Sequence, residues 1–263
     1  MKPVLIFFAV LSVAIVHAAC RSVILVPGGE ATDDEDPQTD GSTDTDGTDS
    51  ASCAPADIDP LVCLDFEVPL DGATTELNGT VALDTDVVYR GQTSLRAETV
   101  AENAIASLRS TFQAIDTGTV YFRVLVFLPA GMATGNIKIL NLSSAGEPPD
   151  EENRGVDVNI SGDLGVNIYQ HGNFARFESA PGLVPEDEWF CLRGSYSIST
   201  TSGATMVWIN DLLVVSTTAS EDAIINGGVS EFETGIGWTE GGQVSALLYV
   251  DDVVVAVEPI PCI

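Results

Sequence analysis

The chain has 263 residues and a formal net charge of −29 at pH 7, from 39 acidic and 10 basic residues. So strong a negative charge repels phosphate backbones, so we do not expect nucleic acid as a partner. It also disfavours anionic polysaccharides such as alginate or heparin unless cations bridge them, and it leaves neutral glycans, cations and proteins open as partners. No uninterrupted apolar run reaches 18 residues, so the sequence predicts no helix that spans a membrane.

Residues 1–20 have the features of an export signal. Lys2 provides a positive charge, and residues 4–16 contain only apolar residues and one Ser. This run is too short to cross the hydrocarbon core of a bilayer, which needs roughly 20 residues, but it fits the apolar region of a signal peptide. The sequence therefore predicts an extracytoplasmic protein.

Two processing sites remain open at the end of this signal. The residues His17-Ala18-Ala19-Cys20 resemble a bacterial lipobox, with His17 where Leu is usual, and this reading makes Cys20 the lipidated first residue of the mature chain. Cleavage before Ala19 would instead give ordinary secretion. Lipidation of Cys20 leaves four other cysteines, an even number that suits two disulfides. We therefore expect an outer-membrane or cell-surface lipoprotein, held to the membrane by a lipid on Cys20, with secretion as the alternative.

Residues 21–62 form an acidic segment built largely from Asp, Thr, Ser and Gly, with eleven acidic residues and one Arg. Such a segment buries too little apolar surface to offset its ordering entropy, and its charges repel one another. Asp44 and Asp46 have the spacing of a calcium loop, but the later ligands are missing. We interpret the segment as a disordered, solvated tether.

Residues 63–263 have the pattern of one all-β domain. Six segments rich in β-branched and aromatic residues are separated by Gly, Pro, Asn or Asp. They cover residues 119–128, 155–161, 164–170, 189–198, 205–210 and 244–257. In the second segment Val156, Val158 and Ile160 alternate with Asp157 and Asn159, so the two sets face opposite sides of a strand. The best helix candidate, residues 100–108, is short.

Tight turns between these segments indicate antiparallel pairing. Asn210-Asp211 and residues 161–164 each lie between two strand-like runs, and Asn and Asp tolerate the left-handed backbone that hairpins need. A single sheet of this size would leave an apolar face in water, so two stacked sheets follow. We expect Trp189 and Trp208 in the core between them.

Five short motifs in this domain resemble the concanavalin A-like lectin/glucanase jelly-roll superfamily and similar jelly-roll carbohydrate-binding modules. They are CLDFE at 63–67, YRGQTSLR at 89–96, WFCL at 189–192, VWIND at 207–211 and YVDDVVV at 249–255. The resemblance implies an antiparallel two-sheet jelly-roll sandwich, all-β in class. It also implies a protein that acts on carbohydrate or binds it.

The resemblance further implies a structural Ca²⁺ ion where the first and last strands meet. Its ligands would be Glu67, Asp252 and the carbonyl of Gly91, with Asp65 and Asp251 as alternates. Carboxylate and carbonyl oxygens are the ligands that Ca²⁺ prefers. The alternative is that these acids face outward from edge strands and are hydrated.

A glycan-binding face is the second site that the resemblance implies, with aromatic platforms flanked by neutral hydrogen-bonding groups. The aromatic candidates are Trp208, Trp238, Tyr169, Tyr121, Phe174 and Phe177. In the strand at 164–170 the side chains of Asn167, Tyr169 and His171 share one face. With Asn173, these residues are predicted to contact a neutral glycan or polysaccharide.

Catalysis is the alternative from another class. Lyases of this fold that resemble alginate lyases need a Tyr and a His, with Arg or Gln to neutralise a uronate carboxylate. The residues that could serve are Tyr169, His171, Arg123 and Arg176. The Q-x-H and Y-x-K-x-G motifs of such lyases are absent, and the domain contains one Lys.

Glucanases need two carboxylates on one strand face, and Glu231 and Glu233 are the nearest match, which we interpret as a solvated strand entry. We therefore predict a non-catalytic carbohydrate-binding domain. A polysaccharide lyase or glucanase is the alternative, and a structural surface-interaction protein is the second alternative.

The four remaining cysteines allow three disulfide pairings. We prefer a short Cys53–Cys63 bridge at the entrance of the domain together with Cys191–Cys262, which would tie residue 262 to the sheet.

Overall fold

The structure is a computed structural model, and it describes residues 53–70, 73–145, 155–171, 175–198, 203–217 and 228–263. Within these ranges the chain forms fifteen β-strands and no helix. The described residues therefore contain no helix that could cross a membrane. The predicted signal, Cys20, most of the predicted tether and Asn173 lie outside the described residues.

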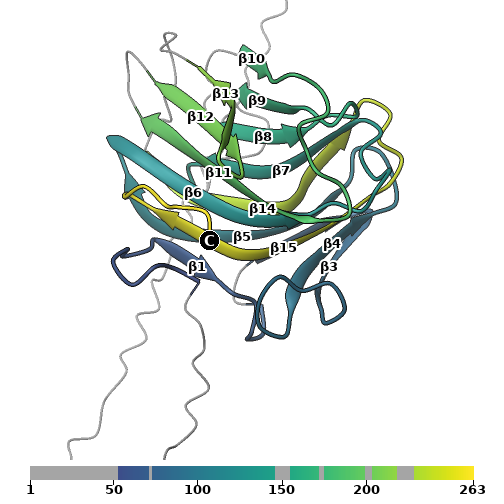
Figure 1. Ribbon diagram of the computed structural model, residues 1–263, viewed down its shortest axis with the longest axis horizontal. Coiled ribbons are helices and arrows are strands. Elements are labelled where there is room, and N and C mark those ends of the chain that lie inside the picture. The colour runs from purple at the N-terminus through teal and green to yellow at the C-terminus, as the bar shows by residue number, and fades with distance from the viewer. Residues whose placement is uncertain (1–52, 71–72, 146–154, 172–174, 199–202, 218–227) are drawn as a thin grey trace, which may run out of the picture. The chain divides into compact units, whose positions relative to one another are not determined.

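The first sheet has eight strands, and every described pair in it is antiparallel. Across the sheet the order is β13 (Leu212–Ser216), β12 (Ala204–Ile209), β11 (Trp189–Ile198), β6 (Gly118–Phe127), β15 (Ala246–Ala256), β4 (Ser94–Thr99) and β3 (Gly79–Asp84), with β1 (Val62–Leu64) also paired with β15. Figure 1 shows how strongly β6 and β15 curve at the centre of this sheet.

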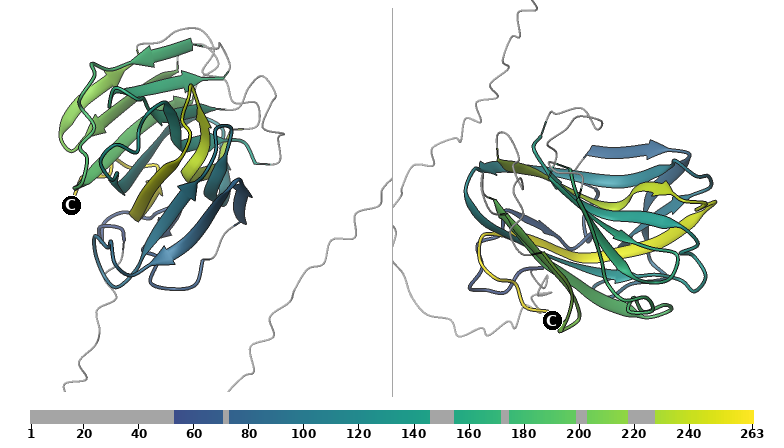
Figure 2. Two further views of the ribbon diagram at one scale, coloured as in Figure 1. Left: turned by 90° about the vertical axis from the view of Figure 1, so that its right-hand side faces the viewer. Right: turned by 90° about the horizontal axis from the view of Figure 1, so that it is seen from above.

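The second sheet has seven strands, also paired antiparallel. Its order is β10 (Ala175–Glu178), β9 (Val166–Gln170), β8 (Val156–Ile160), β7 (Asn136–Ser143), β14 (Val229–Glu240), β5 (Ile105–Ile115) and β2 (Ala73–Leu77). Two further views show the two curved sheets as the layers of a sandwich (Figure 2). The predicted all-β, two-sheet jelly-roll sandwich is confirmed, and all six predicted strand segments form strands.

The core lies between the two sheets. Its largest fully buried apolar side chains include Phe122, Phe190, Phe232, Leu108 and Leu142, which come from both layers. Because side chains alternate along a strand, the residues between these point to the outer faces of the sandwich. The outer face of the seven-stranded sheet carries the polar residues described below.

Both predicted hairpin turns are confirmed, whereas the predicted short helix is wrong. Asn210 and Leu164 both adopt positive φ, at 53° and 61°, in the hairpins that join β12 to β13 and β8 to β9. Residues 105–108, the second half of the helix candidate, belong instead to strand β5. Pairing of β5 with β14 and β2 satisfies its backbone in a way that a short helix could not.

Residues 53–62 pack on the outer face of the eight-stranded sheet. Cys53 is 3% exposed and forms a small apolar cluster with Ala54, Val254, Ala256 and Ile260. The Cys53–Cys63 disulfide, with a Cα–Cα distance of 5.8 Å, ties this segment to β1. Within this segment, which the sequence places in the tether, Cys53, Ala54 and Val62 are therefore buried against the domain.

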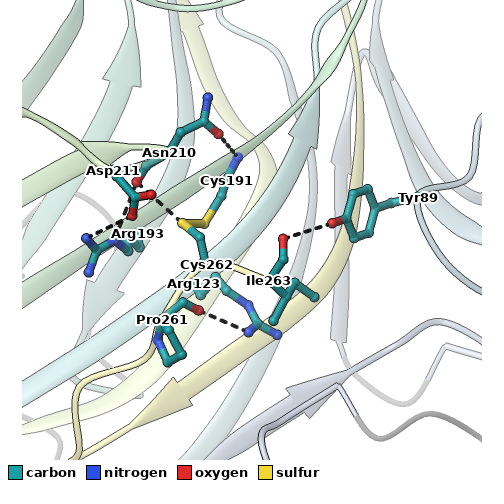
Figure 3. Close-up of a disulfide and its surroundings, with 9 residues drawn as sticks. All are labelled: Tyr89, Arg123, Cys191, Arg193, Asn210, Asp211, Pro261, Cys262 and Ile263. Atoms are coloured by element: carbon teal, nitrogen blue, oxygen red, sulfur yellow. Dashed lines mark hydrogen bonds and ion pairs between the residues drawn. A yellow bond between two sulfur atoms is a disulfide. The ribbon is translucent and has the colours of Figure 1, made fainter.

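A second disulfide, Cys191–Cys262, ties the last residues of the chain to β11, with a Cα–Cα distance of 6.0 Å (Figure 3). Both bridges are the pairs that the sequence favours. Near the second bridge the Tyr89 hydroxyl donates to the Ile263 carbonyl at 3.1 Å, and the Asn210 side chain accepts from the Cys191 amide at 3.0 Å. Two disulfides in one domain fit an oxidising, extracytoplasmic compartment.

Candidate functional site

A row of polar residues crosses the outer face of the seven-stranded sheet. Strand pairing places six of them side by side, one on each of six neighbouring strands. In order they are Arg109, Glu233, Asn141, Asp157, Tyr169 and Arg176. Neighbouring strands lie about 4.8 Å apart, so adjacent members of the row are within reach of one another.

Four residues of this row, Arg109, Asp157, Tyr169 and Arg176, line a cleft with a volume of about 860 Å³. All seven strands or their ends contribute to its lining. The lining residues are Thr75, Ile105, Arg109, Lys138, Asp157, Asn159, Asn167, Tyr169, His171, Arg176, Gly237, Trp238 and Glu240. Seven strands span six inter-strand spacings, or about 29 Å, so the lining residues are drawn from the full width of the sheet.

A β-bulge in β7 brings Lys138 and Asn141 to the same face. The register between β7 and β8 shifts between Lys138 and Leu140, so that Ile139 is the extra residue. Ile139 and Leu140 are both buried in the core, whereas simple alternation would send one of them outward. The bulge therefore lets two polar residues three positions apart reach the cleft.

A second irregularity lies in β14, directly beside that bulge. The register with β7 shifts between Thr234 and Trp238, and Gly235 within this stretch has φ of 101°. A side chain at Gly237 would meet the Cε atom of Lys138 and the Oε2 atom of Glu233. The missing side chain leaves the space through which Lys138 approaches Glu233.

Asp157 is the centre of the hydrogen-bond network in the cleft. Its Oδ2 atom lies 2.8 Å from Nε2 of His171, and its Oδ1 atom accepts from the Asn141 amide at 2.7 Å. The Lys138 ammonium lies 3.7 Å from Oδ1. Burial opposes ionisation of Asp157, but Lys138 and the hydrogen bonds from His171 and Asn141 outweigh it and lower its pKa. Asp157 is therefore an anion at neutral pH.

Glu233 joins this network to the other half of the cleft. It is 2% exposed and accepts from the Ser107 hydroxyl at 2.6 Å. Its carboxylate also lies 3.2 Å from Nε of Arg109 and 3.5 Å from Nζ of Lys138. Burial opposes the charge on Lys138, yet Asp157 and Glu233 together raise the pKa of this lysine. Two cations and two carboxylates thus alternate along the floor of the cleft.

Tyr169 stands beside His171, and their rings meet edge to face with centroids 4.9 Å apart. Burial raises the pKa of Tyr169, and the negative charges of Asp157 and Glu240 raise it further. The phenol is therefore held in its protonated form. Tyr169 is thus a protonated phenol beside the His171 imidazole, which is hydrogen-bonded to the Asp157 carboxylate. Such an arrangement is suited to proton transfer.

Arg176 and a group of amides occupy the end of the cleft near β10. The Asn136 side-chain oxygen accepts from Arg176 and from Asn167, each at 3.3 Å. Asn159 donates to the Asn167 side chain at 3.1 Å. Arg176 pairs with Glu178 at 2.9 Å, and its side chain is 42% exposed, against 29% for Arg109 and 19% for Lys138. Its guanidinium is therefore the cation of the cleft most open to an incoming anion.

Five of the sequence-predicted residues meet in this cleft: Asn167, Tyr169, His171, Arg176 and Trp238. The prediction that Asn167, Tyr169 and His171 share one face is confirmed. Arg123 is a correction. It lies in β6 of the other sheet with no exposed surface, so it cannot reach a ligand in the cleft. Its guanidinium donates to the carbonyl of Cys53 and to that of Pro261, the second of which Figure 3 shows.

The tryptophan prediction also needs correction. Trp189 and Trp208 are only partly buried and lie on the outer face of the eight-stranded sheet. Trp189 contacts the rings of Tyr89 and Phe127, with centroids 5.8 and 5.7 Å away. The Arg193 guanidinium lies 4.9 Å from the Trp208 ring. Aromatic and cationic neighbours thus cover these indoles in place of the core.

Glu233, which the sequence suggests as part of a solvated strand entry, is buried within the cleft network instead. Lys138, Arg109 and Asp157 were also missed as site residues. The presence of a single lysine in the domain was an argument against a lyase in the sequence analysis, yet this lysine, Lys138, lines the cleft. Its rarity was the signal that could have identified it.

We expect Lys138→Met to lower the free energy of unfolding by about 3 kcal/mol near neutral pH, because it leaves Asp157 and Glu233 buried without their shared cation. The loss should shrink in acid. Because the pKa of Asp157 is lower in the folded chain, its ionised form stabilises the fold at pH values above the pKa of the unfolded chain. This stabilisation is lost as the pH falls through the folded-state pKa. Urea unfolding at about pH 7 and about pH 4 measures both effects.

The control for this prediction is the triple variant Lys138→Met, Asp157→Asn, Glu233→Gln. It removes the charges together and should recover part of the loss, since replacing a whole buried ion network costs less than breaking it. A single Lys138→Met variant as stable as the unaltered chain at both pH values would contradict the network.

The residues predicted to hold calcium lie at the junction of β15 with the segment that precedes β4. Oε1 of Glu67 accepts from the amides of Gln92 and Thr93 at 2.7 and 3.2 Å, beside Gly91. Asp252 is buried, and its Oδ2 atom has no hydrogen-bond partner in the described part of the chain. The Arg90 guanidinium lies 3.6 Å from that oxygen.

A buried carboxylate oxygen that has an ion-pair partner but accepts no hydrogen bond can still serve as a ligand for a hard cation. Burial raises the pKa of Asp252, and it raises that of Asp251 to about 6. Among the described residues no three acidic, His or Cys side chains converge on one point, so an ion here would need backbone carbonyls as further ligands.

Comparison with known proteins supports the fold. No protein-family model and no curated protein matches the chain. Among solved structures, an endo-β-1,4-glucuronan lyase from the fungus Trichoderma reesei superposes with a TM-score of 0.57 at 16% identity, covering 75% of this chain and 95% of the other. The cellulose induced protein Cip1 gives a TM-score of 0.59 at 15% identity, covering 76% and 99%.

The alginate lyase vAL-1 from a Chlorella virus gives a TM-score of 0.50 at 11% identity, covering 75% of this chain and 99% of the other. At such low identities a likeness shows the fold alone. The chain is thus an antiparallel jelly-roll sandwich whose structural neighbours include polysaccharide lyases.

Proposed function

We propose that this protein is a polysaccharide lyase that cleaves a uronate-containing polysaccharide by β-elimination. The observation that carries the proposal is the cleft, which brings a protonated Tyr169 and the Asp157-bound His171 together beside Arg176. Three of the eight basic side chains in residues 63–263 line this one cleft of a strongly acidic domain. Basic side chains concentrated in this way favour an anionic ligand.

The reaction follows from the roles that these groups can take. Arg176, with neighbouring amides, binds the carboxylate of the uronate residue and stabilises the charge that develops there. His171 removes the proton from C5, the C4–C5 double bond forms, and the C4–O4 bond breaks. Tyr169 gives its proton to the departing O4 oxygen, and the proton on His171 then returns to Tyr169. No water and no cofactor is consumed.

Binding without cleavage is the second candidate, and the ion pairs of the cleft favour it. Arg109, Lys138 and Arg176 each pair with a carboxylate of the protein, so a substrate carboxylate must compete with Glu231, Glu233 or Glu178. The exposed part of Trp238 could then stack on a sugar ring. In this case the ligand is a glycan, neutral or acidic, that is held but not cut.

The experiment is an assay of the purified protein on polyglucuronate, alginate and a neutral β-glucan, reading the ultraviolet absorbance of the unsaturated uronate product. Cleavage of an acidic polymer supports the lyase. Binding of any of the three polymers, measured by calorimetry without product formation, supports the second candidate. Neither cleavage nor binding by a folded sample would contradict both and leave a structural surface protein.

We also propose, from residues 1–20, that the protein is exported and held at the cell surface by a lipid on Cys20. The two disulfides support an oxidising compartment. Mass spectrometry of the mature N-terminus tests the anchor. A diacylated Cys20 is expected, whereas an unmodified N-terminus at Ala19 would mean secretion without an anchor.

Finally, we propose a structural Ca²⁺ ion bound by Asp252 and backbone carbonyls that include Gly91, with Glu67 shaping the loop. We expect Ca²⁺ to raise the melting temperature at about pH 7 and chelation to lower it, because the ion compensates a buried carboxylate. The gain should be smaller at about pH 5. As the pH falls, Asp251, whose pKa is raised to about 6, and Asp252 become protonated. Protonation removes the cost of burying their negative charges, so the ion has less to compensate.

Differential scanning fluorimetry with Ca²⁺ or a chelator makes this measurement. Asp252→Asn should abolish the Ca²⁺ response, while the exposed control Glu258→Gln should keep it. An unaltered chain whose melting temperature is the same with and without Ca²⁺ would contradict the site.

A further inference from the structure

The two carboxylate oxygens of Asp157 have different partners. Its Oδ1 atom already has two partners, the Asn141 amide at 2.7 Å and the Lys138 ammonium at 3.7 Å. Oδ2 faces only Nε2 of His171, at 2.8 Å, among the contacts of the described residues. The Asn141 amide and Lys138 therefore fix the orientation of the carboxylate, which in turn fixes the imidazole.

Asp157 is ionised, because Lys138 and the hydrogen bonds from His171 and Asn141 lower its pKa. The group that faces Nε2 of His171 is therefore a carboxylate and not a carboxylic acid. A carboxylate accepts hydrogen bonds and cannot donate one when ionised, so the proton on the imidazole must lie on the nitrogen that faces it.

We infer that Asp157 is a positioning residue that holds the His171 imidazole in the tautomer with its proton on Nε2, so that the lone pair lies on Nδ1. The role of Nδ1 as the base rests on the proposed lyase function. The tautomer itself does not. Lys138 and Asn141 extend the arrangement by keeping Asp157 ionised and correctly turned, in the way that a carboxylate orients histidine in hydrolytic triads.

The test is nuclear magnetic resonance of the full chain with ¹⁵N-labelled histidine. The chain contains two histidines, His17 and His171, and the signals missing from a His171→Gln variant identify those of His171. At a pH where the ring is neutral, we expect a pyrrole-type Nε2 and a pyridine-type Nδ1. A proton on Nδ1, or an even mixture of tautomers, would overturn the inference.

The Asp157→Asn variant tests the cause. An asparagine amide can donate to Nε2, so we expect the proton to move to Nδ1, and Asp157→Glu, which keeps a carboxylate, should retain the original tautomer. An unchanged tautomer in a folded Asp157→Asn variant would show that Asp157 does not set it. If that variant does not fold, the tautomer of the unaltered chain still decides the question.

Kinetics separate this inference from the proposed function. If the protein is a lyase, Asp157→Asn should lower kcat by roughly 100-fold or more while KM changes little, because Asp157 acts on the reaction through His171. If the protein binds without cleaving, the resonance result stands or falls on its own. A lyase whose Asp157→Asn variant keeps full kcat would contradict the positioning role.

Discussion

Replacing Tyr169 with phenylalanine is expected to reduce product formation from an acidic polysaccharide by at least about 100-fold, since a positioned proton donor contributes roughly that much or more. The change removes one oxygen and keeps the ring that contacts His171. Binding of the polymer should therefore change by only a few-fold. Initial rates and calorimetry on the same preparations measure the two quantities.

Tyr121→Phe is the matched control for this prediction. Tyr121 lies in β6 of the other sheet, beside the small apolar cluster around Cys53, and loses the same single oxygen far from the cleft. Full activity is expected for it. A Tyr169→Phe variant that keeps most of its activity would exclude Tyr169 as the proton donor, whatever the chain does to its substrate.

Removing the Cys191–Cys262 bridge by two alanine substitutions is expected to lower the free energy of unfolding by about 4 kcal/mol. The bridge closes a sequence separation of 71 residues, and loop-closure entropy grows with that separation. Release of the end of the chain also frees the Pro261 carbonyl that accepts from the buried Arg123. Guanidinium unfolding without reductant measures the change.

The Cys53–Cys63 bridge serves as the comparison, because it closes a separation of only 10 residues and should contribute about 3 kcal/mol on the same basis. Both cysteines of a pair must be replaced, so that no free thiol remains to exchange. If loss of the shorter bridge destabilises the protein more than loss of the longer one, native contacts of residues 53–62 outweigh loop closure.

Alternation along single strands carried the successful part of the sequence prediction. Val156, Val158 and Ile160 do face the core, and Asn167, Tyr169 and His171 do face the cleft, because period-two alternation is set by the strand itself. What alternation cannot give is the layer to which a strand belongs. Arg123 was placed in the site for its chemistry, and β6 carries it in the opposite sheet.

The missing half of the site comes from strands far apart in the chain. Arg109, Lys138 and Glu233 belong to β5, β7 and β14, and only the order of strands in the sheet brings them together. Their ion pairs also allow charged side chains to be buried, whereas most charged side chains lie at the surface. The prediction that Trp189 and Trp208 lie in the core was wrong for a related reason. A large aromatic side chain can also pack against aromatic or cationic neighbours on the outer face of a sheet.

The bulge at Ile139 has a consequence for comparing this chain with distant relatives. A strand without the extra residue would turn either Lys138 or Asn141 toward the core, since a shift of one position exchanges the two faces. An alignment that lacks a one-residue gap at this place will therefore equate cleft residues with core residues. Homologous positions in β7 are best assigned by superposing backbones, with the gap opened at Ile139.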